Sequence, residues 1–256
     1  MSHTQFCHAP LAPVYLAPKS NSQLETQLLY GQEFKVDKLH GAFAEGVAVP
    51  FIANPSGPRS RGYVRVKDLS ANTAQAAYKV TSLKAPIFSR KDIKSPIKMI
   101  LPFGARVQQL SSHREFIRIG RGQYIHRTHI DLIDKYEPDF TATAERHYGL
   151  PYIWGGVSTQ GLDCSGLVQS ALWSAGLACP RNSGEQQSDL GKAINIDSPK
   201  QRGDLIFWKG HVGIMQNSEN MIHANGYHMT TQSEPLTKAA ARIKKSAGPI
   251  IAVKRL

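Results

Sequence analysis

The pattern of hydrophobic and polar positions changes near residue 139. Before that point, short β-branched and aromatic runs are separated by Gly, Pro, Asn and Asp, and no segment keeps the 3.6-residue period of an amphipathic helix. Short runs with frequent turn residues are typical of small all-β barrels. The first half of the chain is therefore predicted to be all β.

The first half also resembles itself. Residues 12–15 (APVY) match residues 85–88 (APIF) at an offset of 73, whereas residues 61–64 (RGYV) match the run that begins at Arg121 at an offset of 60–63. The drop in offset places about ten extra residues in the first copy, in the Pro/Gly-rich segment 46–60. A tandem duplication is predicted.

After residue 139 the pattern favours helices followed by strands. Residues 140–148 read as a short helix capped by Asp139 or Thr141. A second helix is predicted from Cys164 to Ala175, because its apolar residues fall on one face. Five runs downstream read as strands: 205–208, 211–215, 221–224, 227–231 and 250–253. These elements predict an α+β domain.

Composition narrows the class of protein. At 256 residues with 41% hydrophobic and 20% charged residues, the chain is expected to fold into a real core. The net charge of +12 is concentrated in residues 1–139, which hold 19 Lys/Arg against 11 Asp/Glu. Such a surface attracts polyanions, but no Lys/Arg run marks a nucleic-acid arm. A solvated basic surface with no dedicated partner is the simpler interpretation, and neither nucleic acid nor membrane is expected as a partner.

The number of cysteines and the N-terminal residues indicate the cellular compartment of the protein. Three cysteines are too few for the disulfide framework of a small secreted domain, which indicates reduced thiols. The first residues lack a basic and then apolar leader, and no stretch reaches the length of a membrane span. We expect a cytoplasmic protein, or a secreted or periplasmic one if a leader was trimmed. A monomer is favoured, although the sequence does not fix the oligomeric state.

Cys164 is the predicted nucleophile. Asp163 stands at the N-cap position, so the sulfur lies in the first helical turn, where the helix dipole favours the thiolate. His211 opens a predicted strand and is the expected base, and His223 is expected to orient it, with His228 as the alternative. The two rings share a face only if the intervening hairpin loop has an odd number of residues or a bulge. Each residue alone would more often be structural.

No metal or other cofactor is expected, because the His and Cys residues lack ligand-like clustering in the sequence. Gly155, Gly156 and Gly161 are interpreted as giving a peptide substrate close access to the backbone, and Gly166 as keeping the first helical turn open.

Five motifs in order resemble the NlpC/p60 peptidases: YIWGG at 152–156, DCSG at 163–166, PRNS at 180–183, RGDLIFW at 202–208 and GHVGI at 210–214. The repeats resemble bacterial SH3-like domains. The resemblance implies a papain-like α+β catalytic domain at 137–256, preceded by SH3-like barrels at 1–72 and 73–136.

The family resemblance also implies cleavage of the γ-D-glutamyl bond to a diamino acid in peptidoglycan stem peptides, in murein turnover or recycling. Such enzymes need a free N-terminal L-Ala. By the same resemblance the substrate-binding residues are Tyr152 at the oxyanion site, Trp154 along the groove, Asp163 and Ser165 at the amine, and Arg181 and Tyr63. Arg181 could bind a substrate carboxylate or a buried acid. Asn182 stands where several relatives carry an acidic residue.

Two other functions fit the same sequence. An N-acetylmuramoyl-L-alanine amidase would use the same cysteine and histidine on a different bond. A non-catalytic cell-wall-binding protein, or a nucleic-acid-binding one, would use the basic first half of the chain.

Overall fold

The computed structural model describes residues 3–55, 57, 60–71 and 75–256. Contacts divide the chain into two compact units. The N-terminal unit comprises residues 1–51 and 58–136, and the C-terminal unit comprises residues 52–57 and 137–256. Both predicted repeats fall in the N-terminal unit apart from residues 52–57 of the first, and the predicted boundaries at 72/73 and 136/137 stay predictions. No helix among the described residues has the length and apolarity that a membrane crossing requires.

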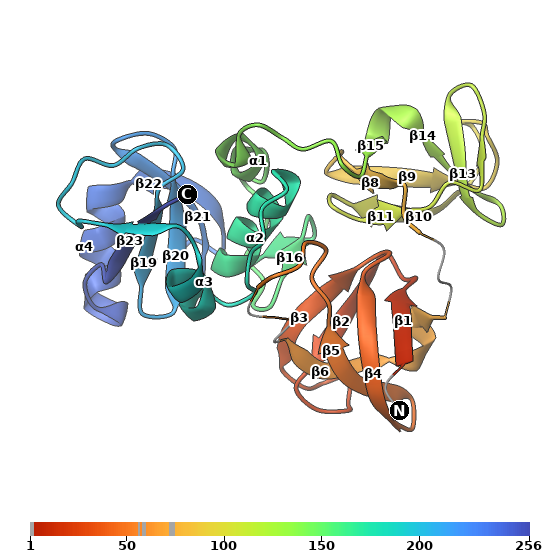
Figure 1. Ribbon diagram of the computed structural model, residues 1–256, viewed down its shortest axis with the longest axis horizontal. Coiled ribbons are helices and arrows are strands. Elements are labelled where there is room, and N and C mark those ends of the chain that lie inside the picture. Colours follow the sequence, from red (N-terminus) through yellow and green to blue (C-terminus); the bar gives the residue numbers. More distant parts are fainter. Residues whose placement is uncertain (1–2, 56, 58–59, 72–74) are drawn as a thin grey trace. The chain divides into compact units, whose positions relative to one another are not determined.

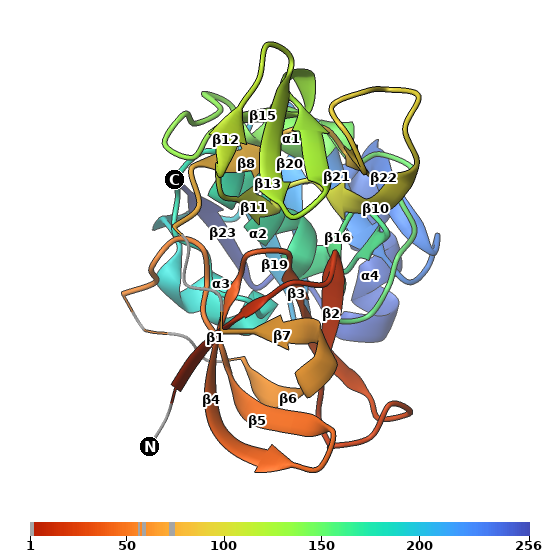
Figure 2. The same cartoon turned by 90° about the vertical axis from the view of Figure 1, so that its right-hand side faces the viewer.

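The first repeat is a strongly curved antiparallel sheet (Figure 2). Its strand order is β3-β2-β6-β5-β4-β1-β7, and its interior is apolar, with Val14, Phe34 and Val64 fully buried. The elements are β1 (His3–Cys7), β2 (Leu11–Tyr15), β3 (Leu24–Leu29), β4 (Glu33–His40), β5 (Phe43–Ala48), β6 (Arg61–Arg65), the 3-10 helix η1 (Val66–Asp68) and β7 (Leu69–Ser70).

The second repeat has the same connectivity. Its sheets run β10-β9-β14-β13-β12 and β11-β8-β15, which reproduces the order of the equivalent strands in the first repeat. The elements are β8 (Tyr78–Val80), β9 (Lys84–Phe88), β10 (Ile97–Pro102), β11 (Arg106–Val107), β12 (Ser111–Ser112), β13 (Phe116–Gly120), β14 (Gln123–His126), the 3-10 helix η2 (Arg127–His129) and β15 (Ile130–Leu132). The extra residues of the first copy lie between β5 and β6, within the predicted segment.

The C-terminal unit is built on one six-stranded antiparallel sheet of order β18-β23-β19-β20-β21-β22 (Figure 1). Four helices and a short hairpin accompany it. In chain order the elements are α1 (Phe140–Arg146), β16 (Val157–Ser158), β17 (Gly161–Leu162), α2 (Cys164–Ser174), α3 (Ser183–Asp189), β18 (Lys192–Ile194), β19 (Leu205–Trp208), β20 (His211–Met215), β21 (Asn220–Asn225), β22 (Thr230–Pro235), α4 (Leu236–Ala247) and β23 (Ala252–Arg255).

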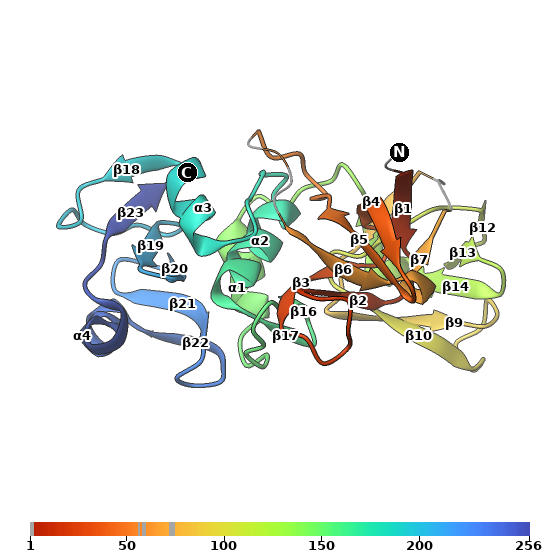
Figure 3. The same ribbon diagram turned by 90° about the horizontal axis from the view of Figure 1, so that it is seen from below.

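Helices cover both faces of this sheet, with α1 and α2 on one side and α4 on the other (Figure 3). Because successive strand residues point to opposite faces, β19 serves two cores. Leu205 and Phe207 pack with the α2 residues, whereas Ile206 and Trp208 pack with Ala239 of α4. Such two-sided burial explains why β19 is apolar throughout.

The predicted helices at 140–148 and 164–175 are present as α1 and α2, and Asp139 rather than Thr141 caps α1. The predicted strand at 227–231 is wrong, because Met229 adopts a left-handed φ of 54° and β22 begins at Thr230. The helices α3 and α4 were not predicted, although α4 buries Ala239 and Ile243 one turn apart on a single face.

Candidate active site

Cys164 is the first residue of α2, as predicted, and Asp163 is its N-cap. The Gly166 N–H donates to Asp163 Oδ1 at 2.7 Å, and the Ser165 hydroxyl donates to the same oxygen at 3.1 Å. Cys164 is 8% exposed. Capping by Asp163 thus fixes the position of the predicted nucleophile at the start of α2.

Asp163 also forms a buried ion pair with Arg181. The guanidinium donates to both carboxylate oxygens, at 3.0 Å to Oδ1 and 2.6 Å to Oδ2, and to Ser165 Oγ at 2.9 Å. Gly155 N–H donates to Oδ2 as well, at 2.9 Å. Of the two roles open to Arg181, contact with a buried acid is the one observed. Since a carboxylate offers about four lone-pair sites, these donors fill it, and an incoming amine must displace one.

The glycines of the DCSG and YIWGG motifs serve backbone packing. A Cβ atom on Gly166 would lie 2.1 Å from the Gly156 carbonyl oxygen, and one on Gly156 would lie 2.5 Å from the Gly161 carbonyl oxygen. These contacts pack the start of α2 against the preceding hairpin. The interpretation of Gly156 and Gly161 as substrate access is not needed to explain them.

A chain of hydrogen bonds runs from His211 to the helix α4. His211 Nε2 lies 2.8 Å from His223 Nδ1, and His223 Nε2 lies 2.8 Å from Glu234 Oε1. Arg242 of α4 in turn donates to both oxygens of Glu234, at 2.5 and 2.6 Å. The sequence analysis assigned no role to Glu234 or Arg242, and the only local signal was their spacing of eight residues across the start of a helix.

This chain fixes the tautomer of both rings. Arg242 and His223 hold the pKa of Glu234 well below its usual range against the opposing effect of burial, so the carboxylate is ionised and only accepts. His223 therefore carries its proton on Nε2 and accepts at Nδ1 from the Nε2–H of His211. The remaining nitrogen of His211, Nδ1, keeps its lone pair and can act as a base.

Strand pairing brings the two rings to the same face. Met215 pairs with Met221, which leaves five residues, 216–220, in the connection. This odd number satisfies the parity condition. Gly213 stands opposite His223, and a Cβ there would lie 3.4 Å from His223 Cβ and 2.6 Å from the terminal Cε of Met221, whose flexible side chain would have to shift.

The backbone of β20 also reaches the nucleophile. The backbone amide of Val212, the residue after His211, hydrogen-bonds Cys164 and lowers its thiol pKa. Val212 and Ile214 pack with Cys164 in one core. The cysteine and the first strand histidine, 47 residues apart in sequence, therefore come from directly packed elements.

Burial favours the neutral form of both Cys164 and His211. Burial and, to a smaller extent, the charge of Asp163 raise the pKa of the Cys164 thiol to about 11. Burial lowers the pKa of His211 to about 3, with a further contribution from His223. The sequence predicts a thiolate from the helix dipole, whereas burial shifts the equilibrium of both groups toward their neutral forms.

We expect the alkylation of Cys164 by iodoacetamide to accelerate about tenfold per pH unit from pH 6 to 9, because only the thiolate reacts and its population rises in that proportion below the pKa. Mass spectrometry of the Cys164 peptide over this range measures the rate. Cys164→Ala reports the background from Cys7 and Cys179, which are buried. A rate that is already constant at pH 6 would show a thiolate and imidazolium pair instead.

We expect Glu234→Gln to lower kcat/KM by about 10²-fold, part of what general acid and base catalysis contributes. The amide can donate as well as accept, so the His223 tautomer is no longer fixed. A change in the pH profile of kcat would distinguish positioning from loss of folding. Glu145→Gln is the matched control, since Glu145 pairs with Arg202 at 2.8 Å in the same unit. Equal effects of both variants would contradict the role of Glu234.

The remaining predicted residues lie in different settings. Tyr152 is half-buried, and burial together with the nearby Cys164 and Asp163 raises its pKa to about 12, so it is a hydrogen-bond donor. Trp154 is 61% exposed. Tyr63 belongs to the N-terminal unit, where it stacks edge-on against His40, and its role stays a prediction.

Two residues that drew attention in the sequence have local roles. His228 lies in the exposed turn after β21 and contacts Asn225 Oδ1 at 3.1 Å, so it does not orient His211. Asn182 is the exposed N-cap of α3 and makes no side-chain capping bond.

One group of ligand-type atoms contradicts the expectation that such residues do not cluster. His223, His228 and Glu234 offer nitrogen and oxygen atoms within 4.8 Å of one another. Glu234 is, however, bound by the Arg242 guanidinium, whose positive charge opposes a cation at the same place. The arrangement fits a histidine-orienting acid better than a metal ligand.

Comparison with known proteins matches this site. Residues 149–244 match the NlpC/P60 family. The chain is 30% identical to a Bacillus cereus protein named gamma-D-glutamyl-L-lysine dipeptidyl-peptidase, over 83% of this chain and 58% of the relative. A Bacillus subtilis protein of the same name is 25% identical, over 80% of this chain and 73% of the relative. The chain thus spans little more than half the length of the first relative.

Solved structures show the same fold. An NlpC/P60 family protein from Bacillus cereus superposes with a TM-score of 0.82 at 23% identity, covering 99% of both chains. An NlpC/P60 endopeptidase from Photobacterium damselae gives 0.63 at 13% identity, covering 97% of this chain and 70% of the other. The cysteine at the start of α2 and the oriented histidine thus occur in a segment, residues 149–244, that is similar to the NlpC/P60 family.

Proposed function

We propose that the chain is a cysteine endopeptidase that cleaves the γ-D-glutamyl bond to a diamino acid in peptidoglycan stem peptides. Two relatives with this bond in their names support the proposal. The observation that carries it is the hydrogen-bond chain that leaves His211 Nδ1 unprotonated in the unit that bears Cys164. The antiparallel sheet facing a cysteine helix is also the arrangement of a papain-like domain, and the repeats fit SH3-like barrels.

The reaction proceeds in two halves. His211 Nδ1 takes the thiol proton as Cys164 Sγ attacks the γ-carbonyl carbon, which forms the S–C bond and an oxyanion. The Tyr152 phenol, kept protonated, is proposed to donate to that oxyanion. His211 then returns the proton to the leaving amine of the diamino acid, and the C–N bond breaks. Water, deprotonated by His211, hydrolyses the thioester and restores the thiol.

The substrate is proposed to carry a free N-terminal L-Ala, as soluble products of murein turnover do. Ser165, 5% exposed and beside Asp163, and Trp154, which is exposed, are proposed to line its binding groove. Arg181 is proposed to hold Asp163 in place. The amine would then replace one of the donors now bound to Asp163.

The test is to incubate the protein with L-Ala-γ-D-Glu-meso-diaminopimelate, with its L-Lys counterpart, and with N-acetylated forms of both. Release of L-Ala-γ-D-Glu from the free peptides, at least about tenfold faster than from blocked ones, is expected. A muramyl peptide as substrate checks the alternative activity, since release of the intact stem peptide would indicate an amidase. Binding to cell wall without any hydrolysis would indicate a non-catalytic binding protein.

A further inference from the structure

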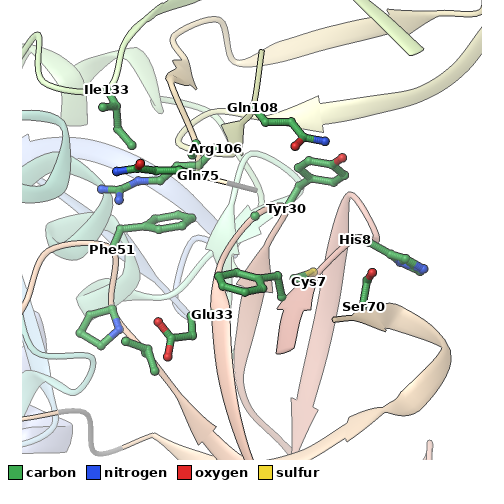
Figure 4. Close-up of a pocket in the computed structure, with 15 residues that line it drawn as sticks. Cys7, His8, Tyr30, Glu33, Phe51, Ser70, Gln75, Arg106, Gln108 and Ile133 are labelled. Atoms are coloured by element: carbon green, nitrogen blue, oxygen red, sulfur yellow. The ribbon is translucent and has the colours of Figure 1, made fainter. Parts of the chain in front are cut away.

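A pocket lies within the N-terminal unit, lined by residues of both repeats (Figure 4). Its volume is about 640 Å³, within the range of about 300–1,000 Å³ that small-molecule sites occupy. Cys7, Tyr30 and Glu33 line it from the first repeat, and Arg106 and Gln108 from the second. No part of the proposed peptidase site contributes to it.

The two repeats meet tightly at the wall of this pocket. The Arg106 backbone N–H donates to the Tyr30 carbonyl at 2.9 Å, and the Tyr30 ring packs on the core of the second repeat. Gly31, with φ of 79°, leaves no room for a side chain, since a Cβ would lie 2.2 Å from the Arg106 carbonyl oxygen. These contacts hold Arg106 in a defined position before any ligand arrives.

The guanidinium of Arg106 has no carboxylate partner among the residues that the structure describes. Its Cζ atom lies 4.2 Å from the centre of the Phe51 ring, which holds the plane of the guanidinium against the pocket wall (Figure 4). Burial lowers the pKa of Arg106 to about 10, so it keeps its charge at neutral pH while being partly removed from water. A half-buried, unpaired arginine held by an aromatic ring is a strong site for a carboxylate.

Other groups in the pocket select the kind of carboxylate. Glu33 also lines the pocket, and among the described residues its carboxylate makes only a long contact of 3.4 Å with the Thr4 hydroxyl, so its charge repels di-anions and attracts a cation. Gln108 Oε1 is buried with no donor among the described residues, although its Nε2 donates to the Ile119 carbonyl at 3.0 Å. An amide N–H of a ligand would satisfy this oxygen. The rings of Tyr30 and Phe51 suit small apolar side chains.

We propose that this pocket binds a short peptide with both ends free, its carboxylate on Arg106 and its ammonium drawn toward Glu33. A peptide supplies all three features that the pocket calls for: a carboxylate, a cation and amide N–H groups. The proposal concerns binding alone and does not depend on the proposed peptidase activity.

Isothermal titration of the full chain with trialanine, trialanine amide and N-acetyl-trialanine tests the proposal. We expect trialanine to bind and its amide to bind at least about tenfold more weakly, because the charge-assisted contact with Arg106 is lost. Arg106→Gln should weaken trialanine binding to the same degree, with Arg106→Lys in between. Arg114→Gln is the matched control, since it makes the same charge change at an exposed position of the second repeat.

Glu33→Gln tests whether the charge of Glu33 attracts the ammonium group of the peptide and repels an anion. It should weaken trialanine binding and strengthen N-acetyl-trialanine binding, because the acetylated peptide is an anion that Glu33 repels. In ¹⁵N spectra of the parent protein, trialanine should shift the side-chain Nε signal of Arg106, and this shifting signal should be absent from Arg106→Gln, which locates the contact. Thermal melts check that each variant folds. Equal affinity for trialanine and its amide, or equal effects of Arg106→Gln and Arg114→Gln, would overturn the proposal, whether or not the chain hydrolyses stem peptides.

Discussion

Replacing Cys164 with alanine is expected to lower kcat/KM for L-Ala-γ-D-Glu-meso-diaminopimelate by about 10⁴-fold or more. The sulfur forms the covalent bond to the substrate carbonyl, and no other residue can do so from the start of α2. The helix cap of Asp163 and the packing of Val212 remain, so substrate binding should change little. Steady-state kinetics on purified protein, with product release followed by mass spectrometry, measures the loss.

Cys179→Ala is the matched control for this variant. Cys179 is fully buried in the same domain, and burial strongly raises the pKa of its thiol above the usual value, so it is not a nucleophile. Its replacement should cost stability but leave kcat/KM within about threefold of the parent. A Cys164→Ala variant that keeps more than a few per cent of the activity would remove the cysteine mechanism altogether.

Replacing Arg181 with methionine is expected to destabilise the C-terminal domain by about 3–5 kcal/mol, because it leaves the Asp163 charge buried without a partner. The two side chains are only 6% and 11% exposed, so water cannot take the place of the guanidinium. Urea denaturation followed by tryptophan fluorescence measures the change in the free energy of unfolding, with Trp173 and Trp208 inside this domain.

A double-mutant cycle separates the charge effect from packing. Asp163→Asn removes the charge and keeps a capping side chain, so the Arg181→Met and Asp163→Asn pair should recover at least about half of the loss. Arg202→Met is the control, since Arg202 is 40% exposed and its ion pairs are screened by water, with an expected cost of about 1 kcal/mol. An Arg181→Met loss no larger than that of Arg202→Met would show that the buried pair does not stabilise the domain.

The positions of the histidines and the cysteine illustrate how much follows from sequence. Helix capping and strand alternation are local, so the start of α2 at Cys164 and the strands that carry His211 and His223 could be predicted from neighbouring residues alone. The sequence could state that His211 and His223 share a face only if the connecting loop has an odd number of residues. It could not decide whether this holds, because the length of the loop depends on which residues pair. The repeats were also readable, since both copies keep the same order of turns.

Long-range contacts could not be read in this way. The sequence left Arg181 between two roles, and only the folded chain shows that its guanidinium contacts Asp163, 18 residues away, directly at 2.6 Å. The roles of Glu234 and Arg242 were not predicted, because they depend on long-range contacts. β21 pairs with β22, which carries Glu234, and Arg242 of α4 binds Glu234.

The sequence by itself determined which local elements hold the candidate residues, because caps, turns and alternation depend on near neighbours. Tertiary structure alone decided how strongly burial acts on Cys164 and His211. The helix dipole is a local effect and favours the thiolate, whereas burial depends on every element packed around the two residues, and it raises the pKa of the Cys164 thiol and lowers that of His211.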